Sequence, residues 1–175
     1  MARKLRAAGI DTVANFIIGS PGETWEEIRQ TIKYAEELEV DYVKFFICTP
    51  LAGTKMFKMA VDMGYLDENF DFAKHDWSGG TFDTPYWRAK DLAILRAYEW
   101  DRVNFSNPER KKKIMRMMGI TEERLDEIRW ATITKANPDS SSSEKKKVNS
   151  YLTTRERPVE HSKVAHAALS ATSIT

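Results

Sequence analysis

The sequence predicts an α/β fold in which two short parallel strands and their helices precede a mostly helical region. A run of β-branched and aromatic residues at 12–18 has the length and composition of a strand buried on both faces of a parallel sheet, and residues 42–48 predict a second strand. Between them, residues 24–38 place apolar side chains three and four positions apart, which is the pattern of an amphipathic helix. A strand, a helix and a strand joined by short links favour parallel neighbours with a right-handed crossover.

Local signals mark where the first helices begin and end. Residues 2–8 predict the last turns of a helix. Thr24, followed three positions later by Glu27, fits a capping box at the start of the next helix. Thr54 can cap a further helix, which Gly64 ends.

The remainder of the chain is predicted to be helical and then disordered. An irregular, aromatic-rich stretch at 65–87 precedes three predicted helices, at about 88–105, 108–118 and 121–134. Beyond them, a run of serines and a lysine triplet cannot bury enough apolar surface to offset the entropy of ordering. The predicted organisation is therefore a β/α part at 1–70, a mostly helical extension at 71–135 and a disordered tail at 136–175.

The composition argues against several classes of protein. Lys and Arg total 27 against 26 Asp and Glu, and a net charge of +1 does not favour a nucleic-acid or membrane-surface binder. No stretch approaches the roughly 20 apolar residues that span a bilayer. No apolar run follows the basic N-terminus, so we expect no signal peptide and a cytoplasmic protein.

Cys48 is the single cysteine in the sequence. Alone it cannot form an intramolecular disulfide, hold an iron–sulfur cluster or complete a thiolate zinc site. It ends a predicted strand, where a small core residue is the simplest interpretation and a thiol facing a site is the alternative. The residues predict no metal ligands, and they leave the catalytic residues unknown.

The most specific feature is the segment Asn15–Thr24, with the sequence NFIIGSPGET. A buried strand runs here into a glycine-rich turn and a helix, which exposes backbone where parallel α/β folds bind ligands. A phosphate-binding P-loop would need a lysine after its last glycine, and Glu23 follows Gly22 instead. A plain turn between a strand and a capped helix is the other alternative.

This segment resembles the motif on the fifth barrel strand of radical S-adenosylmethionine (SAM) enzymes, most closely the form found in their cobalamin-dependent and methylthiotransferase-like branches. The loop Thr49–Thr54 resembles the PxPGT loop that follows strand six in this family, with Leu51 and Ala52 in place of the usual residues. The resemblance covers about residues 1–70 and keeps both motifs in the order and separation of the family.

The resemblance implies strands five and six of a TIM-like (β/α)6 barrel, with SAM lying across its carboxyl face. In the complete enzyme a [4Fe–4S] cluster would cleave SAM reductively to a 5′-deoxyadenosyl radical, and cobalamin is a further candidate cofactor. Glu23 takes the place of the motif's glutamate one residue later than usual, and helix capping is an alternative role for it. The candidate cofactor-binding residues are Asn15, Ile17, Gly19, Glu23, Pro50 and Gly53.

The family's CxxxCxxC loop and Gly-Gly-Glu segment precede the part that this chain resembles. We therefore expect a fragment that is inactive alone and is complemented by a separately encoded N-terminal half, so its own status as an enzyme stays open. A non-catalytic half-barrel that binds a partner and a stand-alone α/β domain are the alternatives. Membranes and nucleic acids are not expected partners, and the sequence does not identify the substrate.

Two features of the helical region have both a functional and a structural interpretation. Tyr86 and Trp87 are candidates to line a substrate entrance, but packing of the extension on the barrel is the simpler interpretation. The basic run 110–113 favours a solvated helix face over a nucleic-acid patch, because no aromatic residues interleave it.

Overall fold

The computed structural model of the chain describes residues 2–74 and 79–137 and has an α/β fold. The predicted helices and strands are confirmed, with ends shifted by at most two residues. Of the predicted tail, Ala136 still belongs to the last helix, and residues 138–175 lie outside the described part. The elements are α1 (Ala2–Ala7), β1 (Val13–Ile18), α2 (Trp25–Glu37), β2 (Tyr42–Ile47), α3 (Lys55–Asp62), a 3₁₀ turn (Phe72–Lys74), α4 (Ala89–Phe105), α5 (Pro108–Met118) and α6 (Glu122–Ala136).

The helices begin and end where the local signals place them. The Thr24 hydroxyl accepts from the Glu27 N–H, and the Glu27 carboxylate accepts from the Thr24 N–H, so the capping box is confirmed. Thr54 caps α3 by accepting from the Phe57 N–H at 3.1 Å. Gly119 ends α5 in the left-handed conformation, at φ 64°.

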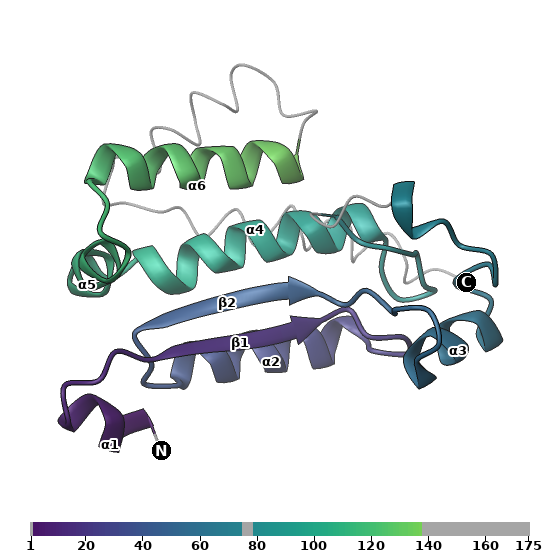
Figure 1. The fold of residues 1–175 in the computed structure, drawn as a ribbon, viewed down its shortest axis with the longest axis horizontal. Helices are drawn as coiled ribbons and strands as arrows, with labels where there is room; N and C mark the ends of the chain where they lie inside the picture. The colour runs from purple at the N-terminus through teal and green to yellow at the C-terminus, as the bar shows by residue number, and fades with distance from the viewer. Residues whose placement is uncertain (1, 75–78, 138–175) are drawn as a thin grey trace.

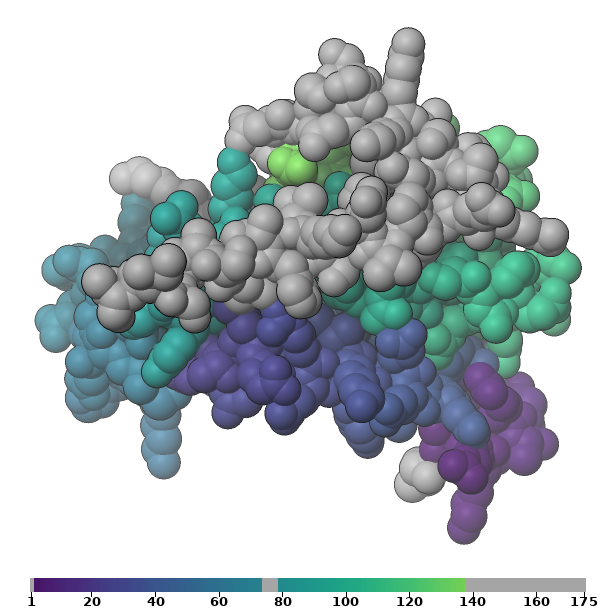
Figure 2. Space-filling view, turned by 180° about the vertical axis from the view of Figure 1, so that it is seen from behind, coloured from purple at the N-terminus to yellow at the C-terminus, as the bar shows by residue number. Residues whose placement is uncertain are grey.

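The molecule is built in layers around the two-stranded parallel sheet (Figure 1). Helix α2 covers the rear of the sheet, as the view from behind shows (Figure 2). Helix α4 lies along β2, and α6 packs on the outer side of α4 (Figure 1). None of the described helices is both long and apolar enough to cross a membrane.

The two faces of the sheet differ in their exposure to solvent. Parallel pairing in the register Phe16 to Phe45 and Ile17 to Phe46 puts paired residues on the same face. Phe16 and Phe45 lie on the covered face, with ring centroids 5.9 Å apart, whereas Ile17 is 62% exposed and Phe46 is 49% exposed. The prediction that both faces are buried is therefore wrong for β1, although Tyr42 on the second face is buried against Trp100 of α4.

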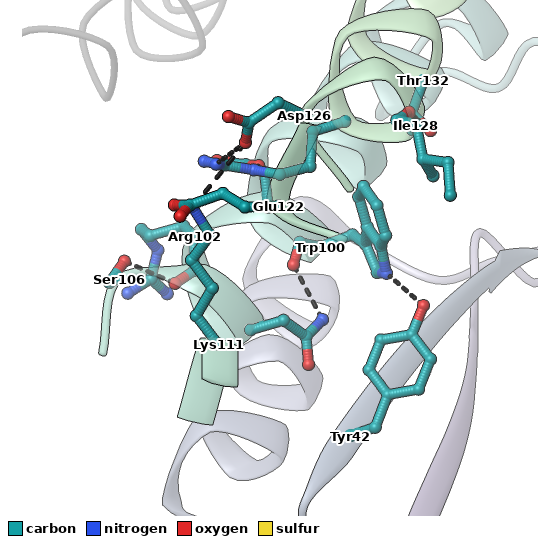
Figure 3. A network of polar contacts seen from close by, with 12 residues as sticks. Tyr42, Trp100, Arg102, Ser106, Lys111, Glu122, Asp126, Ile128 and Thr132 are labelled. Atoms are coloured by element: carbon teal, nitrogen blue, oxygen red, sulfur yellow. Dashed lines mark hydrogen bonds and ion pairs between the residues drawn. The ribbon is translucent and has the colours of Figure 1, made fainter. Parts of the chain in front are cut away.

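At Val43, the outer edge of β2 is bonded by a side chain of α4. The Val43 N–H donates to Asn104 Oδ1 at 2.9 Å, and Asn104 Nδ2 donates to the Val43 carbonyl at 2.8 Å. The amide of a fully buried asparagine thus takes the place of a neighbouring strand. One turn earlier in α4, the Trp100 indole N–H donates to the Tyr42 hydroxyl at 3.1 Å (Figure 3).

Ion pairs attach the last two helices to this core. Arg129 of α6 reaches Asp101 of α4 through Nε at 2.6 Å and Nη2 at 3.2 Å, and both side chains are buried. Lys111 of α5 pairs with Glu122 of α6 at 2.6 Å, and Figure 3 shows the two side chains converging. These contacts join α6 to α4 and to α5.

Most of the basic run on α5 serves the fold. Arg110 donates to the carbonyls of Val40 at 2.6 Å and Val103 at 2.9 Å, which joins α5 to the loop before β2. Lys111 is only 16% exposed, whereas Lys112 is 70% exposed. The interpretation of this run as a solvated face is therefore correct for Lys112 and wrong for Arg110 and Lys111.

A buried carboxylate joins the amino ends of the two strands. Asp41 Oδ2 accepts from the backbone N–H and the hydroxyl of Thr12, both at 2.9 Å. Lys113 Nζ lies 2.7 Å from Asp41 Oδ1. Burial raises the pKa of Asp41, but the hydrogen bonds from Lys113 and Thr12 outweigh it and lower the pKa from 3.8 to about 2.

Replacing Asn104 by Ala should lower the free energy of unfolding by about 2 to 4 kcal/mol, because it leaves two buried backbone groups of Val43 without partners. Asn15→Ala removes the same group from an exposed position of β1 and should change stability by less than about 0.5 kcal/mol. Urea unfolding followed by circular dichroism measures both. Equal effects of the two substitutions would show that the Asn104 amide does not support the edge.

The Asp41 carboxylate should make stability depend on pH in the acid range. A folded pKa of about 2 against an unfolded value of 3.8 contributes about 2 kcal/mol above pH 4, which is lost as the pH falls toward 2. The stability difference between the wild type and Asp41→Asn should therefore shrink between pH 5 and pH 3 in urea titrations. The exposed Asp62→Asn is the control, and a difference for Asp41→Asn that does not change with pH would contradict the assignment.

Candidate functional site

The candidate site lies at the carboxyl ends of β1 and β2, where the turn after β1 closes on a carboxylate. Glu23 Oε2 accepts from the backbone N–H groups of Gly19 at 2.6 Å and Ser20 at 2.8 Å. Its position before α2 also places negative charge at the helix N-terminus. The hydrogen bonds of the Glu23 carboxylate therefore hold the turn before α2, and the side chain that caps the helix is that of Thr24.

Helix α4 and the segment before it pack closely under this turn. Gly19 has φ +80°, and a Cβ added to it would lie 2.3 Å from Cδ2 of Leu92. Trp87 is buried, and its indole N–H donates to the Glu23 carbonyl at 2.8 Å. The structural interpretation of Trp87 is therefore confirmed, while Tyr86 is half exposed.

The loop after β2 combines a buried start with an exposed tip. The Pro50 side chain is fully buried, whereas Gly53 is exposed with φ +79°, and a Cβ added to it would meet no atom within 4 Å. Cys48 is also buried, with Sγ 3.0 Å from Met56 Sδ. Burial raises the pKa of the Cys48 thiol, a hydrogen bond with Ser20 opposes this rise, and the charge of Glu23 adds to it.

The open face of the sheet carries the other candidate residues. Asn15 and Ile17 both point to this face and are exposed. The Cys48 N–H donates to the Ile18 carbonyl, so the parallel ladder uses the backbone of Ile18 and leaves that of Ile17 directed away from β2. Ile17 therefore presents an apolar side chain next to backbone groups on the outer edge of β1.

The six predicted residues fall into three places. Gly19 and Glu23 are joined by a hydrogen bond in the turn, and Asn15 and Ile17 share the open face. Pro50 and Gly53 lie in the second loop, one inside the core and one at the surface. Asn15 therefore lies in the middle of β1, and the other five residues lie toward the carboxyl ends of the two strands or beyond them.

Sequence reasoning missed the grouping of Ser20, Cys48 and Glu23 where the two strands end. The local signal for this grouping is that both residues follow a strand closely. Cys48 comes directly after β2, and Ser20 comes two residues after the end of β1. The described residues include no group of three or more His, Cys, Asp or Glu side chains placed to hold a metal ion. With a single buried thiol of raised pKa, this chain's residues do not fit an iron–sulfur cluster.

Segments of this chain are similar in sequence to parts of known proteins. A segment of 53 residues is 45% identical to a protein of Pyrococcus horikoshii named as an uncharacterized methyltransferase, and it makes up 30% of this chain and 12% of that protein. A segment of 99 residues is 27% identical to the cytidylyl-2-hydroxyethylphosphonate methyltransferase of Streptomyces wedmorensis, over 53% of this chain and 18% of that enzyme.

A third similarity is to a tRNA-modifying enzyme. Over 54 residues the chain is 43% identical to the tRNA-2-methylthio-N(6)-dimethylallyladenosine synthase of Pseudomonas syringae pv. syringae, which is 30% of this chain and 12% of the enzyme. The chain therefore matches less than a fifth of the length of each of these three relatives. No protein-family profile matches the chain, and no solved structure matches it significantly.

Gly19 and Gly53 have the same backbone conformation, but substitution by alanine should lower the free energy of unfolding by different amounts. Gly19→Ala should lower the free energy of unfolding by about 3 kcal/mol, because the strain of a positive φ adds to the clash with Leu92. Gly53→Ala has the strain but no neighbour within 4 Å, so about 1 kcal/mol is expected. Chemical denaturation of both variants measures the difference.

The double variant Gly19→Ala/Leu92→Ala isolates the clash. In the Gly19→Ala background, Leu92→Ala should cost less than it does in the wild type, because it removes the atom that the new Cβ meets. Strictly additive effects would show that α4 does not press on the turn.

Proposed function

We propose that this chain forms the strand-five and strand-six part of a radical SAM barrel and contributes to the binding of SAM at its carboxyl face. The observation that carries the proposal is the segment Asn15–Thr24, which the structure places at the carboxyl end of a parallel strand with one face exposed. The complete enzyme would cleave SAM reductively. The present chain would supply binding surface.

The similar proteins support this proposal through their names. Two of them are named methyltransferases, and the third is named for the installation of a methylthio group on a tRNA adenosine. The name of the third protein agrees with the methylthiotransferase-like branch that the motif resembles. Because each match is short, the family, the reaction and the substrate of this chain are part of the proposal.

The open face fits the adenine side of SAM. An adenine ring needs an apolar platform and hydrogen-bonding groups at its edge, and Ile17 offers both through its exposed side chain and its outward backbone. The Gly19 N–H is engaged by Glu23 and the Pro50 ring is buried. We therefore propose Asn15 and Ile17 as the direct contacts, with Gly19 and Glu23 shaping the turn and the loop 50–53 bordering it.

The cluster of the complete enzyme would need ligands that this chain does not supply, since its one cysteine does not fit such a site. We propose that a separate N-terminal barrel half supplies them and pairs with the outer edge of β1. Strand addition satisfies the outward backbone groups of Ile17 and buries Ile17 and Phe46 inside the barrel. Cobalamin is proposed as a further cofactor of the complete enzyme on the basis of the family resemblance alone.

A chimeric enzyme tests the proposal. In the Pseudomonas methylthio synthase, the matching 54 residues are replaced by those of this chain, and iron content, SAM affinity and 5′-deoxyadenosine formation are measured. The chimera should keep its cluster and cleave SAM. Ile17→Glu should then weaken SAM binding at least about tenfold, because it puts a charge on the apolar platform, while Gln30→Glu on the exposed side of α2 should leave it unchanged.

The isolated chain provides the complementary measurement. After anaerobic reconstitution it should hold no cluster, and SAM should bind about a thousandfold more weakly than to the chimera, since the contacts to the cluster are missing. A chimera that folds and retains its cluster but neither binds nor cleaves SAM would refute the proposed function. So would equal SAM affinities of Ile17→Glu and Gln30→Glu.

A further inference from the structure

The outer edge of β1 lacks the features that keep a strand edge unpaired. The ladder with β2 uses the backbone of alternate residues, so the N–H and C=O groups of Val13, Asn15 and Ile17 point outward. Open edges are usually guarded by a charge, a proline or a bulge. Residues 13–18 include no charged residue and no proline, and their register with β2 runs without a bulge. The edge is therefore open to pairing with a further strand.

The sequence of β1 matches itself when two copies run antiparallel about a twofold axis at Asn15. Val13 then lies opposite Ile17 of the second copy, and Asn15 lies opposite its own counterpart. All three residues point their backbone groups outward, so each opposed pair exchanges two backbone hydrogen bonds. Val13 is 49% exposed and Ile17 is 62% exposed in the single chain, and this pairing buries them against each other. A shift by two residues would set the Asn15 amide against an apolar side chain, which disfavours other registers.

The other face of β1 fits the same arrangement. Ala14 lies opposite Phe16 of the second copy, so a small side chain faces a large one. Tyr34 of α2 packs edge-on against Phe16, with ring centroids 6.1 Å apart, and is 58% exposed. Apolar side chains therefore flank the junction on both faces of the sheet.

The charges at the two ends of β1 are complementary. Helix α1 lies at the amino end of β1 and has the sequence ARKLRA, which is basic and contains no acidic residue (Figure 1). Helix α2 begins beyond the carboxyl end of β1 with Glu26 and Glu27 in its first turn. An antiparallel pair brings the basic α1 of one copy toward the acidic start of α2 in the other, whereas a parallel pair would bring like charges together. The charges therefore favour the antiparallel pair.

We infer that the edge of β1 is a dimer interface, and that its partner is a second copy of this chain, joined antiparallel about Asn15. The two sheets then form one continuous sheet with β1 strands at its centre, and α4 lies along the β2 strand of each copy. The hydrogen bonds across the junction satisfy the outward backbone groups of both copies.

The N-terminal half of the proposed function would use the same edge, so dimerisation competes with complementation. The dimer is the form that the chain takes without that half. The inference does not rest on the proposed function, however. A chain that stays monomeric leaves SAM binding by the chimera untouched, and a chimera that does not bind SAM leaves the dimer standing.

Size-exclusion chromatography with light scattering, over a concentration series of the whole chain, tests the interface. The chain should change reversibly from monomer to dimer in the micromolar range. Asn15→Pro removes an outward N–H and leaves the ladder to β2 intact, and it should weaken dimerisation at least about tenfold, because each dimer loses two hydrogen bonds. Asn15→Ala keeps the N–H and should weaken dimerisation less.

A pair of opposite charges tests the register. Ile17→Lys and Val13→Asp each put an unpaired charge at the junction and should each weaken dimerisation at least about tenfold. The double variant should recover most of this loss, since the new charges face each other across the axis. Met118→Lys, a matched change at an exposed apolar position of α5, should have no effect. This cycle tests the interface even if Asn15→Pro does not fold.

A chain that remains monomeric at about 100 µM would overturn the inference. Association into species larger than two copies would overturn it as well. A dimer that Asn15→Pro and Ile17→Lys leave equally stable would do the same, because another surface would then hold the copies together. Failure of the double variant to recover dimerisation would rule out the antiparallel register.

Discussion

A parallel sheet of two strands has two outer edges, and the rest of this structure depends on how the chain treats them. On the β2 side, Asn104 bonds both backbone groups of Val43, so a side-chain amide fixes α4 against the strand. Because α4 is held there, Leu92 and Trp100 reach the two ends of the sheet, and α6 can pack on the outside through Arg129. On the β1 side no described side chain bonds the strand edge as Asn104 does on β2, and the backbone groups of Ile17 point outward.

The turn after β1 shows how local bonding limits what a ligand can use. Glu23 occupies the N–H groups of Gly19 and Ser20, and Trp87 donates to the Glu23 carbonyl. The turn is therefore stabilised both by the Glu23 carboxylate and by Trp87 of the helical extension. The groups proposed to contact SAM are those that this bonding leaves free, on the edge of β1 and on the open face of the sheet.

The parts that the sequence predicted are those governed by near neighbours in the chain. The capping box of Thr24 and Glu27 and the stop at Gly119 need only a few adjacent residues, and they are found as expected. The Asn104–Val43 bonds join residues 61 positions apart, and an asparagine inside a helix carries no signal of such a contact. The exposure of Ile17 depends on which elements are present to cover it, so a strand composition typical of a buried sheet misled the prediction.

The asymmetry of the sheet also limits how copies of this chain can join to one another. An open-ended fibril needs two free edges per copy, because every copy must accept a strand on one side and offer one on the other. Here α4 blocks one side, so within the described part of the chain β1 alone offers a free edge. Two copies that met through β1 would consume both edges and close as a twofold pair, at which point growth by strand pairing stops. A helix that packs along one strand thereby protects a half-exposed sheet against unlimited polymerisation.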